Sequence, residues 1–255
     1  MLITVDGLVI AGRNAGDSSR YIDVLTKEYG VIEVLARGVK KITGHNAQSV
    51  AIFTYAAFCL NKRELSYTLN SARVKYSFHG LSADIRALSL AAYFSEAVKY
   101  TSASEQHGGN ALRITLMALY ELEKGQSRAL IKAAFELRLS AELGVAPRLA
   151  SCAGCAGNAG ENENMYLCVG DGVMLCEKCR GKTAEKVFAL TPGVLKAARY
   201  ALGSPLARLY KFSASRDVSR GLSVVAQEYF LYHLGRGFKT LEYYGNLRRF
   251  DVQPP

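Results

Sequence analysis

Five of the six cysteines in this chain lie within residues 152–179, and four of them form two pairs with the spacing Cys-x-x-Cys. The first pair is Cys152 and Cys155, and the second is Cys176 and Cys179, with 20 residues between the pairs. Each pair forms a tight turn, here called a knuckle, that directs two thiolates to one point. Two knuckles supply four sulfur ligands in a tetrahedron, so the spacing predicts a Zn2+ ion at about 2.3 Å from each sulfur.

Four thiolates complete the coordination shell of zinc, and the expected ion is therefore structural and not catalytic. It replaces the hydrophobic core that so short and polar a segment does not build. Disulfides, an iron–sulfur cluster and a segment without metal remain alternative interpretations of the same cysteines. Cys168, between the knuckles, is a fifth candidate ligand, but its place in a predicted hairpin favours a small buried side chain, and we expect the same of Cys59.

The chain carries a net charge of +10, and the positive excess lies near its two ends. Residues 1–80 hold ten Lys and Arg against six Asp and Glu, and residues 184–255 hold eleven against five. In between, residues 81–150 hold eight against seven, and residues 151–183 hold three against four. An excess of this size favours nucleic acid as a partner, or less often an anionic membrane surface. If the two ends fold side by side, they form one basic surface.

Basic and aromatic residues are interleaved in residues 1–80, as in grooves that bind single strands, where each stacked base contributes about 1–3 kcal/mol. Arg37, Lys40 and Lys41 lie at a strand end and in the loop after it, where Gly38 allows the backbone to approach a ligand closely. The other basic residues of this region are Arg13, Arg20, Lys62, Arg63, Arg73 and Lys75. The rings available for stacking are Tyr21, Tyr29, Phe53, Tyr55, Tyr67 and Tyr76.

A second basic group lies near the C-terminus and consists of Arg208, Lys211, Arg216 and Arg220. Apolar side chains accompany these cations in the sequence. The combination suits either further contact with DNA or the binding of an acidic, hydrophobic peptide tail.

The elements that position these residues change in type near residue 80. Five segments read as strands, namely residues 2–12, 20–26, 31–37, 50–60 and 65–78, and apolar residues alternate with polar ones in 20–26 and 31–37. A five-stranded sheet of this length closes into a small barrel, and the OB-fold is the commonest such barrel with a nucleic-acid surface.

From residue 81 the apolar spacing is helical. The predicted helices are 83–100, 111–124, 128–143 and 217–235, and Ser82, Asn110 and Ser127 are the expected caps of the first three. Thr191-Pro192 and Ser204-Pro205 mark the expected starts of two further helices. We expect residues 248–255 to be loose. The chain is therefore predicted to be an α+β protein with an OB-fold barrel in residues 1–80. An all-helical domain in residues 81–255 follows, and it carries the zinc-binding segment 151–183.

The sequence lacks the patterns of an enzyme and of a membrane protein. The Gly-Lys-Thr run at residues 181–183 does not form a phosphate-binding loop, because the required glycine five places earlier is Cys176. The four histidines are scattered, and no nucleophile motif or acidic metal cluster is visible. No secretory signal or membrane-spanning stretch is apparent. We expect a cytoplasmic, nucleoid-associated protein without catalytic residues.

Four features, in this order, resemble the bacterial recombination mediator RecO family. They are the segment YIDVLTKEYGVIEVLARGVKK, the helical domain after it, MYLCVGDGVMLC between the knuckles and the late HLGRGFKTLEYY. The resemblance covers nearly the whole chain and implies an OB-fold, a helical domain and a structural zinc site. It matches Arg37 and Lys41 to basic positions of the barrel loop, and the four knuckle cysteines to zinc ligands. Thr240 stands where serine is usual, and Cys168 is an additional cysteine.

The resemblance implies a protein that binds single- and double-stranded DNA and anneals complementary strands. Such proteins work with RecR and assist RecA in displacing single-strand-binding protein, whose tail is a further expected partner. The alternative interpretations are an RNA-binding OB-fold protein with a zinc knuckle and a zinc-stabilised adaptor for acidic protein tails. Competition by RNA of equal length tests the first alternative. Charge reversal at Arg37 and Lys41 tests the second.

Overall fold

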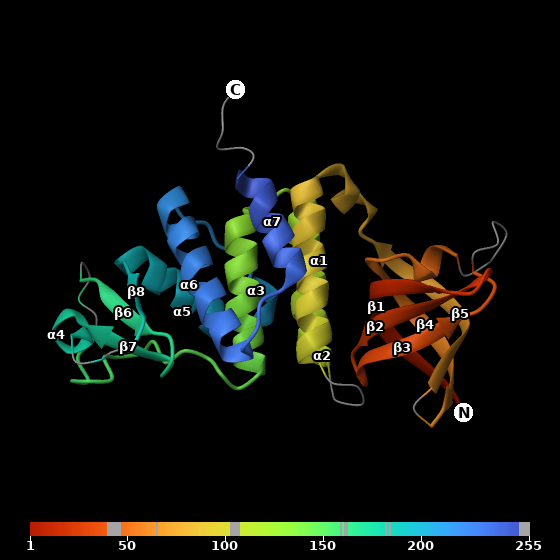
Figure 1. The fold of residues 1–255 in the computed structure, drawn as a ribbon, viewed down its shortest axis with the longest axis horizontal. Coiled ribbons are helices and arrows are strands. Elements are labelled where there is room, and N and C mark those ends of the chain that lie inside the picture. The colour runs from red at the N-terminus through yellow and green to blue at the C-terminus, as the bar shows by residue number, and fades with distance from the viewer. Residues whose placement is uncertain are drawn as a thin grey trace. The chain divides into compact units, whose positions relative to one another are not determined.

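The structure is a computed structural model that describes residues 1–39, 47–64, 66–102, 108–158, 160, 163–181, 183 and 185–249, with side chains up to residue 247. The chain packs into two compact units (Figure 1). The first unit consists of Met1–Glu123 and Phe238–Pro255, and the second of Lys124–Gly237. The division of the chain into functional domains at residue 80 stays a prediction.

The first unit begins with a closed barrel of five strands. These strands are β1 (Leu2–Ala15), β2 (Ser19–Thr26), β3 (Gly30–Ala36), β4 (Thr54–Arg63) and β5 (Ser66–Ser77). Their order around the barrel is β1-β2-β3-β5-β4, and β3 and β5 form the parallel pair that closes it. This three-strand meander with a crossed final pair is the OB-fold, and the predicted barrel is confirmed.

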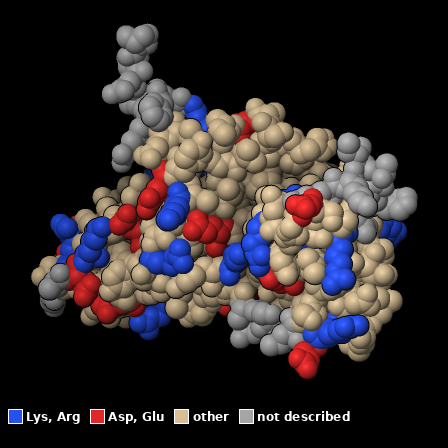
Figure 2. All heavy atoms as spheres, turned by 45° about the vertical axis from the view of Figure 1, so that its right-hand side comes forward, with Lys and Arg blue, Asp and Glu red and all other residues tan. Residues whose placement is uncertain are grey.

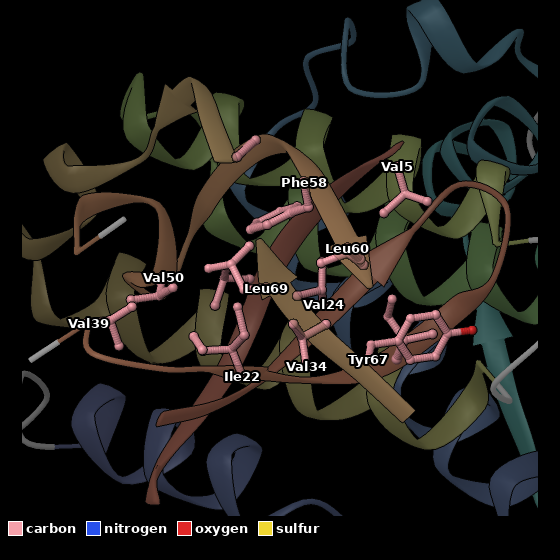
Figure 3. Close-up of a cluster of buried hydrophobic side chains, with 14 residues drawn as sticks. Val5, Ile22, Val24, Val34, Val39, Val50, Phe58, Leu60, Tyr67 and Leu69 are labelled. Atoms are coloured by element: carbon pink, nitrogen blue, oxygen red, sulfur yellow. The ribbon is translucent and has the colours of Figure 1, made fainter. Parts of the chain in front are cut away.

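The barrel closes around one apolar core because its strands alternate between inward and outward side chains (Figure 3). In β3, Ile32 and Val34 point inward, whereas Glu33 is exposed. The fourth strand is displaced from its predicted place, since it spans Thr54–Arg63 and not residues 50–60. Phe53 adopts a positive φ of 63° and donates its N–H to the carbonyl of Val9, so the chain turns there instead of extending.

Three helices complete the first unit, namely α1 (Ile85–Thr101), α2 (Gly109–Glu123) and α7 (Lys239–Arg249). The predicted cap Ser82 is wrong: Asp84 caps α1 by accepting hydrogen bonds from the N–H groups of Arg86 and Ala87. Ser82 lies in the preceding 3-10 turn, where its hydroxyl donates to His79. A carboxylate next to the helix start satisfies two N–H groups that a more distant serine does not reach.

Helix α7 was not predicted as a helix, and it packs on α1. The ring of Phe238 lies 5.6 Å from the ring of Tyr93 on α1. The backbone N–H and the hydroxyl of Thr240 both donate to the carboxylate of Glu96, at 3.2 and 2.6 Å. Glu96 therefore supplies from α1 the acceptor that the first turn of α7 requires.

The second unit contains α3 (Arg128–Glu142), α5 (Pro192–Gly203) and α6 (Arg216–Leu234), with α3 packed against α6. Thr191 caps α5 as predicted, with Pro192 at the first helical position, and Gly235 ends α6 in the left-handed conformation. Ser127 occupies the capping position of α3 without a side-chain hydrogen bond. The helix predicted after Ser204-Pro205 is only a 3-10 turn, Leu206–Arg208.

A small sheet in the second unit carries the cysteines. It consists of β6 (Met165–Cys168), β7 (Val173–Cys176) and β8 (Val187–Leu190), in the order β7-β6-β8, with the one-turn helix α4 (Glu177–Arg180) after β7. The hairpin of β6 and β7 was predicted, whereas β8 was not. Within the described residues, no helix is both long and apolar enough to cross a bilayer.

Candidate functional site

The structure brings the four knuckle cysteines together in the second unit. Their four sulfur atoms all lie within 4.8 Å of one another, and the sulfurs of Cys155 and Cys176 are 3.8 Å apart. Cys152 and Cys155 come from the loop before the sheet. Cys176 ends β7, and Cys179 lies in α4.

The spacing of the sulfur atoms fits a bound metal ion better than disulfides. Four sulfurs at 2.3 Å from a central ion form a tetrahedron with edges of about 3.8 Å. A disulfide requires about 2.05 Å, and all six cysteines are free thiols. An all-sulfur set of this geometry selects zinc or an iron–sulfur centre.

Backbone geometry shapes the first knuckle around the cluster. The N–H of Ala156 donates to the carbonyl of Cys152, and the N–H of Cys152 donates to the carbonyl of Gly157. A Cβ atom at position 154 would lie 2.9 Å from the sulfur of Cys179, so only glycine fits there. The loop thus folds tightly enough to bring both of its sulfurs to the second knuckle.

Hydrogen bonding shifts the pKa values of two of the four thiols in opposite directions. Burial alone would raise the pKa of the Cys152 thiol, but N–H groups of Cys176, Gly154 and Cys155 donate to its sulfur and lower the pKa to about 6. The pKa of Cys179 rises to about 12, because its thiol donates to the sulfur of Cys176 and is desolvated. A metal ion would displace the remaining protons, since only thiolates bind it.

The cluster is tied to the helices of its unit. Arg199 on α5 donates to the carbonyls of Leu149 and Ala150, both at 2.8 Å, just before the first knuckle. The N–H of Ala153 donates to the carbonyl of Met174 on β7. These hydrogen bonds connect the loop of the first knuckle to β7 and to α5.

The other two cysteines lie outside the cluster. Cys168 is 0% exposed, and its thiol lies 3.5 Å from a carboxylate oxygen of Asp171. Cys59 is partly buried in β4, beside Asn70. Neither sulfur belongs to the group of four, as expected for small packed side chains.

A second site is a groove of about 750 Å3 on the barrel. Strands β2 and β3 and the hairpin of β4 and β5 form it, and this is the face on which OB-folds bind oligonucleotides. The lining residues of this barrel groove are Met1, Tyr21, Glu33, Leu35, Arg37, Asn61, Arg63, Ser66, Tyr67 and Thr68. Lys and Arg side chains lie around the barrel surface that faces the viewer in Figure 2.

Two of the predicted DNA contacts, Arg37 and Arg63, line the barrel groove and are exposed. Within the part of the chain that the structure describes, neither guanidinium forms an ion pair with a carboxylate. Lys40 and Lys41 lie outside the described residues. The groove therefore presents two cations whose charge is available to a ligand.

The two remaining predicted barrel contacts are placed differently. Arg13 borders the groove, but it forms an ion pair with Glu33 at 2.5 Å and stacks over the ring of Tyr21. Arg20 is half-buried, and its guanidinium lies against Gly12 and does not line the groove. Among the described residues, the Nε atom of Arg20 has no hydrogen-bond partner.

Two of the predicted rings, Tyr21 and Tyr67, line the barrel groove, but Tyr67 is only 3% exposed and its ring belongs to the barrel core. Lys62 lies over the rings of Tyr29 and Tyr67, with its ammonium nitrogen 4.6 and 5.4 Å from their centroids. Phe53 is buried. The groove also contains polar residues that the sequence analysis missed, which are Asn61, Ser66 and Thr68. Their outward positions in alternating strands were the signal that would have found them.

The C-terminal cations Arg208, Lys211, Arg216 and Arg220 are all exposed and belong to the second unit. A small pocket of about 100 Å3 lies between the start of α3 and residues 210–214, and Lys211 falls within that segment of the sequence without lining the pocket. Leu130, Ile131, Tyr210 and Phe212 give this pocket apolar walls. The expected site for an acidic, hydrophobic tail in this region stays a prediction.

Comparison with known proteins decides the family. The family described as Recombination protein O N terminal matches residues 1–78, and Recombination protein O C terminal matches residues 82–242. The chain belongs to the RecO family. Its relatives named DNA repair protein RecO include those of Acetivibrio thermocellus (29% identical, covering 97% of this chain and 98% of the relative) and Alkaliphilus metalliredigens (29%, covering 95% and 98%). The relative of Pelotomaculum thermopropionicum is 28% identical and covers 99% of this chain and 96% of its own length.

The late motif that carried the resemblance to the RecO family has a defined place in the structure. HLGRGFKTLEYY spans the end of α6, the left-handed Gly235 and the start of α7. Within this motif, Thr240 makes the two bonds to Glu96 on α1.

Proposed function

We propose that this chain is a non-enzymatic DNA-strand handler that acts in repair and recombination. It binds single- and double-stranded DNA through the barrel and anneals complementary strands. The observation that carries the proposal is the barrel groove, in which Arg37 and Arg63 stand without carboxylate partners among the described residues, beside the partly exposed ring of Tyr21. Membership of the RecO family supports the same function.

The annealing step needs no chemistry from the protein. Two strands repel each other through their phosphates, and a basic surface that contacts both screens the repulsion. Base pairing then proceeds with its own free energy. Lys40 and Lys41 come three and four residues after Arg37 in the sequence. In this proposal they add to the positive charge that Arg37 and Arg63 give the groove.

We propose that the metal in the cysteine cluster is zinc and that its role is structural. Cys152, Cys155, Cys176 and Cys179 would hold it, and the ion would join two knuckles that are 20 residues apart in sequence. All four ligands come from the protein, so the ion supplies cohesion and no reactive water. Annealing itself would then depend on the barrel and not on the metal.

The proposal includes protein partners that family membership suggests. With RecR, the chain would assist RecA loading on strands covered by single-strand-binding protein. The apolar pocket at residues 210–214 supports binding of that protein's tail, because its walls suit hydrophobic side chains and the exposed Arg208, Lys211 and Arg216 are close to it in the sequence. Arg220 lies one helical turn after Arg216 on α6 and extends the same basic set. Such a protein would act in the cytoplasm, on the nucleoid.

Strand annealing and oligonucleotide binding test the function. The variant Arg37→Ala/Arg63→Ala should bind single-stranded DNA at least about 10-fold more weakly at 50 mM salt, since each charge-assisted contact contributes about 1.5–3 kcal/mol. The slope of log affinity against log salt should become shallower by about 1.4, or 0.7 for each lost contact. Lys27→Ala/Arg73→Ala removes the same charge from exposed barrel positions outside the groove and is the matched control.

Three results would count against the proposal. Equal losses in the two double variants would mean that the groove is not the binding surface. Displacement of DNA by RNA of equal length would favour an RNA-binding protein. Unchanged DNA binding after charge reversal at Arg37 and Lys41 would favour an adaptor for acidic tails.

A further inference from the structure

The barrel groove contains one carboxylate among its described lining residues, that of Glu33. Glu33 lies on the outward face of β3, and its side chain is 47% exposed. A negative charge in a groove that also holds Arg37 and Arg63 opposes the binding of a polyanion. Its presence there calls for a physical explanation.

Glu33 engages a cation from a strand that is not its neighbour in the barrel. Arg13 on β1 stands directly opposite Tyr21 on β2, and Tyr21 stands opposite Leu35 on β3, two residues from Glu33. All three functional side chains therefore lie on the same outer face. The guanidinium of Arg13 lies 4.2 Å from the centroid of the Tyr21 ring, and its nitrogen is 2.5 Å from the carboxylate of Glu33.

This arrangement holds Arg13 on the ring of Tyr21 in the absence of a ligand. The carboxylate fixes one end of the guanidinium and the ring supports its plane. Both charged side chains are about half exposed, 60% for Arg13 and 47% for Glu33, so the ion pair itself is weak and exchanges readily. A phosphate group has two oxygens that can accept hydrogen bonds from a guanidinium in the same way as a carboxylate. The phosphates of a bound nucleic acid would also be attracted by the other cations of the groove.

We propose that Glu33 is an internal competitor of nucleic-acid phosphate. In the free protein it occupies Arg13 and keeps that cation on Tyr21, and in the complex a phosphate takes Arg13 from it. This inference rests on the proposed function of the groove. Its consequence is that Glu33 lowers the affinity of the groove, which lets a protein that pairs two strands release them afterwards.

Fluorescence anisotropy with a labelled oligothymidylate, at 50 to 200 mM salt, tests the exchange. Glu33→Gln should bind about 3- to 10-fold more tightly than wild type at 50 mM salt, because Arg13 is released and a repulsive charge is removed. The salt slope should steepen by about 0.7, the value for one more phosphate contact. Glu28→Gln is the matched control, since Glu28 is exposed on the β2–β3 turn outside the groove and loses the same charge.

The double variant Arg13→Ala/Glu33→Gln separates competition from simple charge removal. If Glu33 acts by holding Arg13, the gain in affinity from Glu33→Gln should largely disappear in a protein that already carries Arg13→Ala. The double variant should then bind about as tightly as Arg13→Ala alone. A gain that persists without Arg13 overturns the proposal, and so does a gain no larger than that of Glu28→Gln. In either case a larger loss of binding in Arg37→Ala/Arg63→Ala than in Lys27→Ala/Arg73→Ala keeps the proposed function of the groove. Absence of wild-type binding would instead refute the proposed function, and this inference with it.

Discussion

The buried ion pair in α3 allows a quantitative test of the packing of the second unit. Lys132 and Glu136 are 1% and 0% exposed, and their charged atoms are 2.9 Å apart. The ammonium of Lys132 also donates to the carbonyl of Ser223 on α6, at 3.3 Å. The pair therefore links α3 to α6 at a place from which water is excluded.

Replacing Lys132 by Met removes the cation and leaves a buried carboxylate without its charge partner. Breaking a buried pair in this way costs about 3–5 kcal/mol. With an unfolding entropy of about 2.1 cal/mol/K per residue, such a loss lowers the melting temperature of the unit Lys124–Gly237 by roughly 13–21 °C. The double variant Lys132→Met/Glu136→Leu removes both charges, and replacing a whole buried pair by apolar groups is often neutral or stabilising. It should therefore be clearly more stable than the single variant.

Urea unfolding followed by circular dichroism measures both effects. Lys196→Met, at an exposed position of α5, is the control for the substitution itself and should stay within about 0.5 kcal/mol of wild type. A loss below about 1 kcal/mol for Lys132→Met would show that the carboxylate of Glu136 is hydrated. A double variant as unstable as the single one would show that the loss comes from packing and not from charge.

Two further predictions concern the metal cluster and a buried tyrosine. Chelation should remove one zinc ion per chain and lower the melting temperature of the second unit. Gly154→Ala should weaken metal binding about 10-fold or more, because the added Cβ would lie 2.9 Å from the sulfur of Cys179. Equal metal content in Gly154→Ala and wild type at limiting zinc would contradict this expectation. Burial raises the pKa of Tyr229, which is 1% exposed, from 10.0 to about 12. The folded state therefore holds the phenol proton longer than the unfolded state does, so this stability is complete below pH 10 and falls by up to about 2.7 kcal/mol as the pH rises to 12. Urea midpoints at pH 9 and pH 11.5 should show a smaller fall for Tyr229→Phe than for wild type, and parallel falls would refute the assignment.

Local signals in the sequence predicted the parts of the fold that depend on local chemistry. Strand alternation gave the barrel, and the spacing of the cysteines gave the cluster, because both patterns require only near neighbours. Helix α7 has few apolar residues of its own and depends on Glu96 and Tyr93 of α1 for its first turn, so its sequence alone carried little helical signal. Strand β8 has four residues and exists by pairing with β6. Neither dependence is visible without the tertiary fold.

The net charge predicted the class of partner but not the residues that contact it, because the cations of this chain lie in three different environments. Lys132 is buried against Glu136, and its charge is neutralised inside the protein. Arg13, like Lys75 with Asp6 and Lys99 with Asp23, is paired at the surface, so its charge is largely cancelled at a distance. Among the described residues of the groove, Arg37 and Arg63 form no ion pair and keep their charge available. The tertiary fold decides which environment each cation has, since it sets which carboxylate reaches which cation. The affinity of the barrel for a polyanion should therefore follow the pairing of its cations more closely than their number.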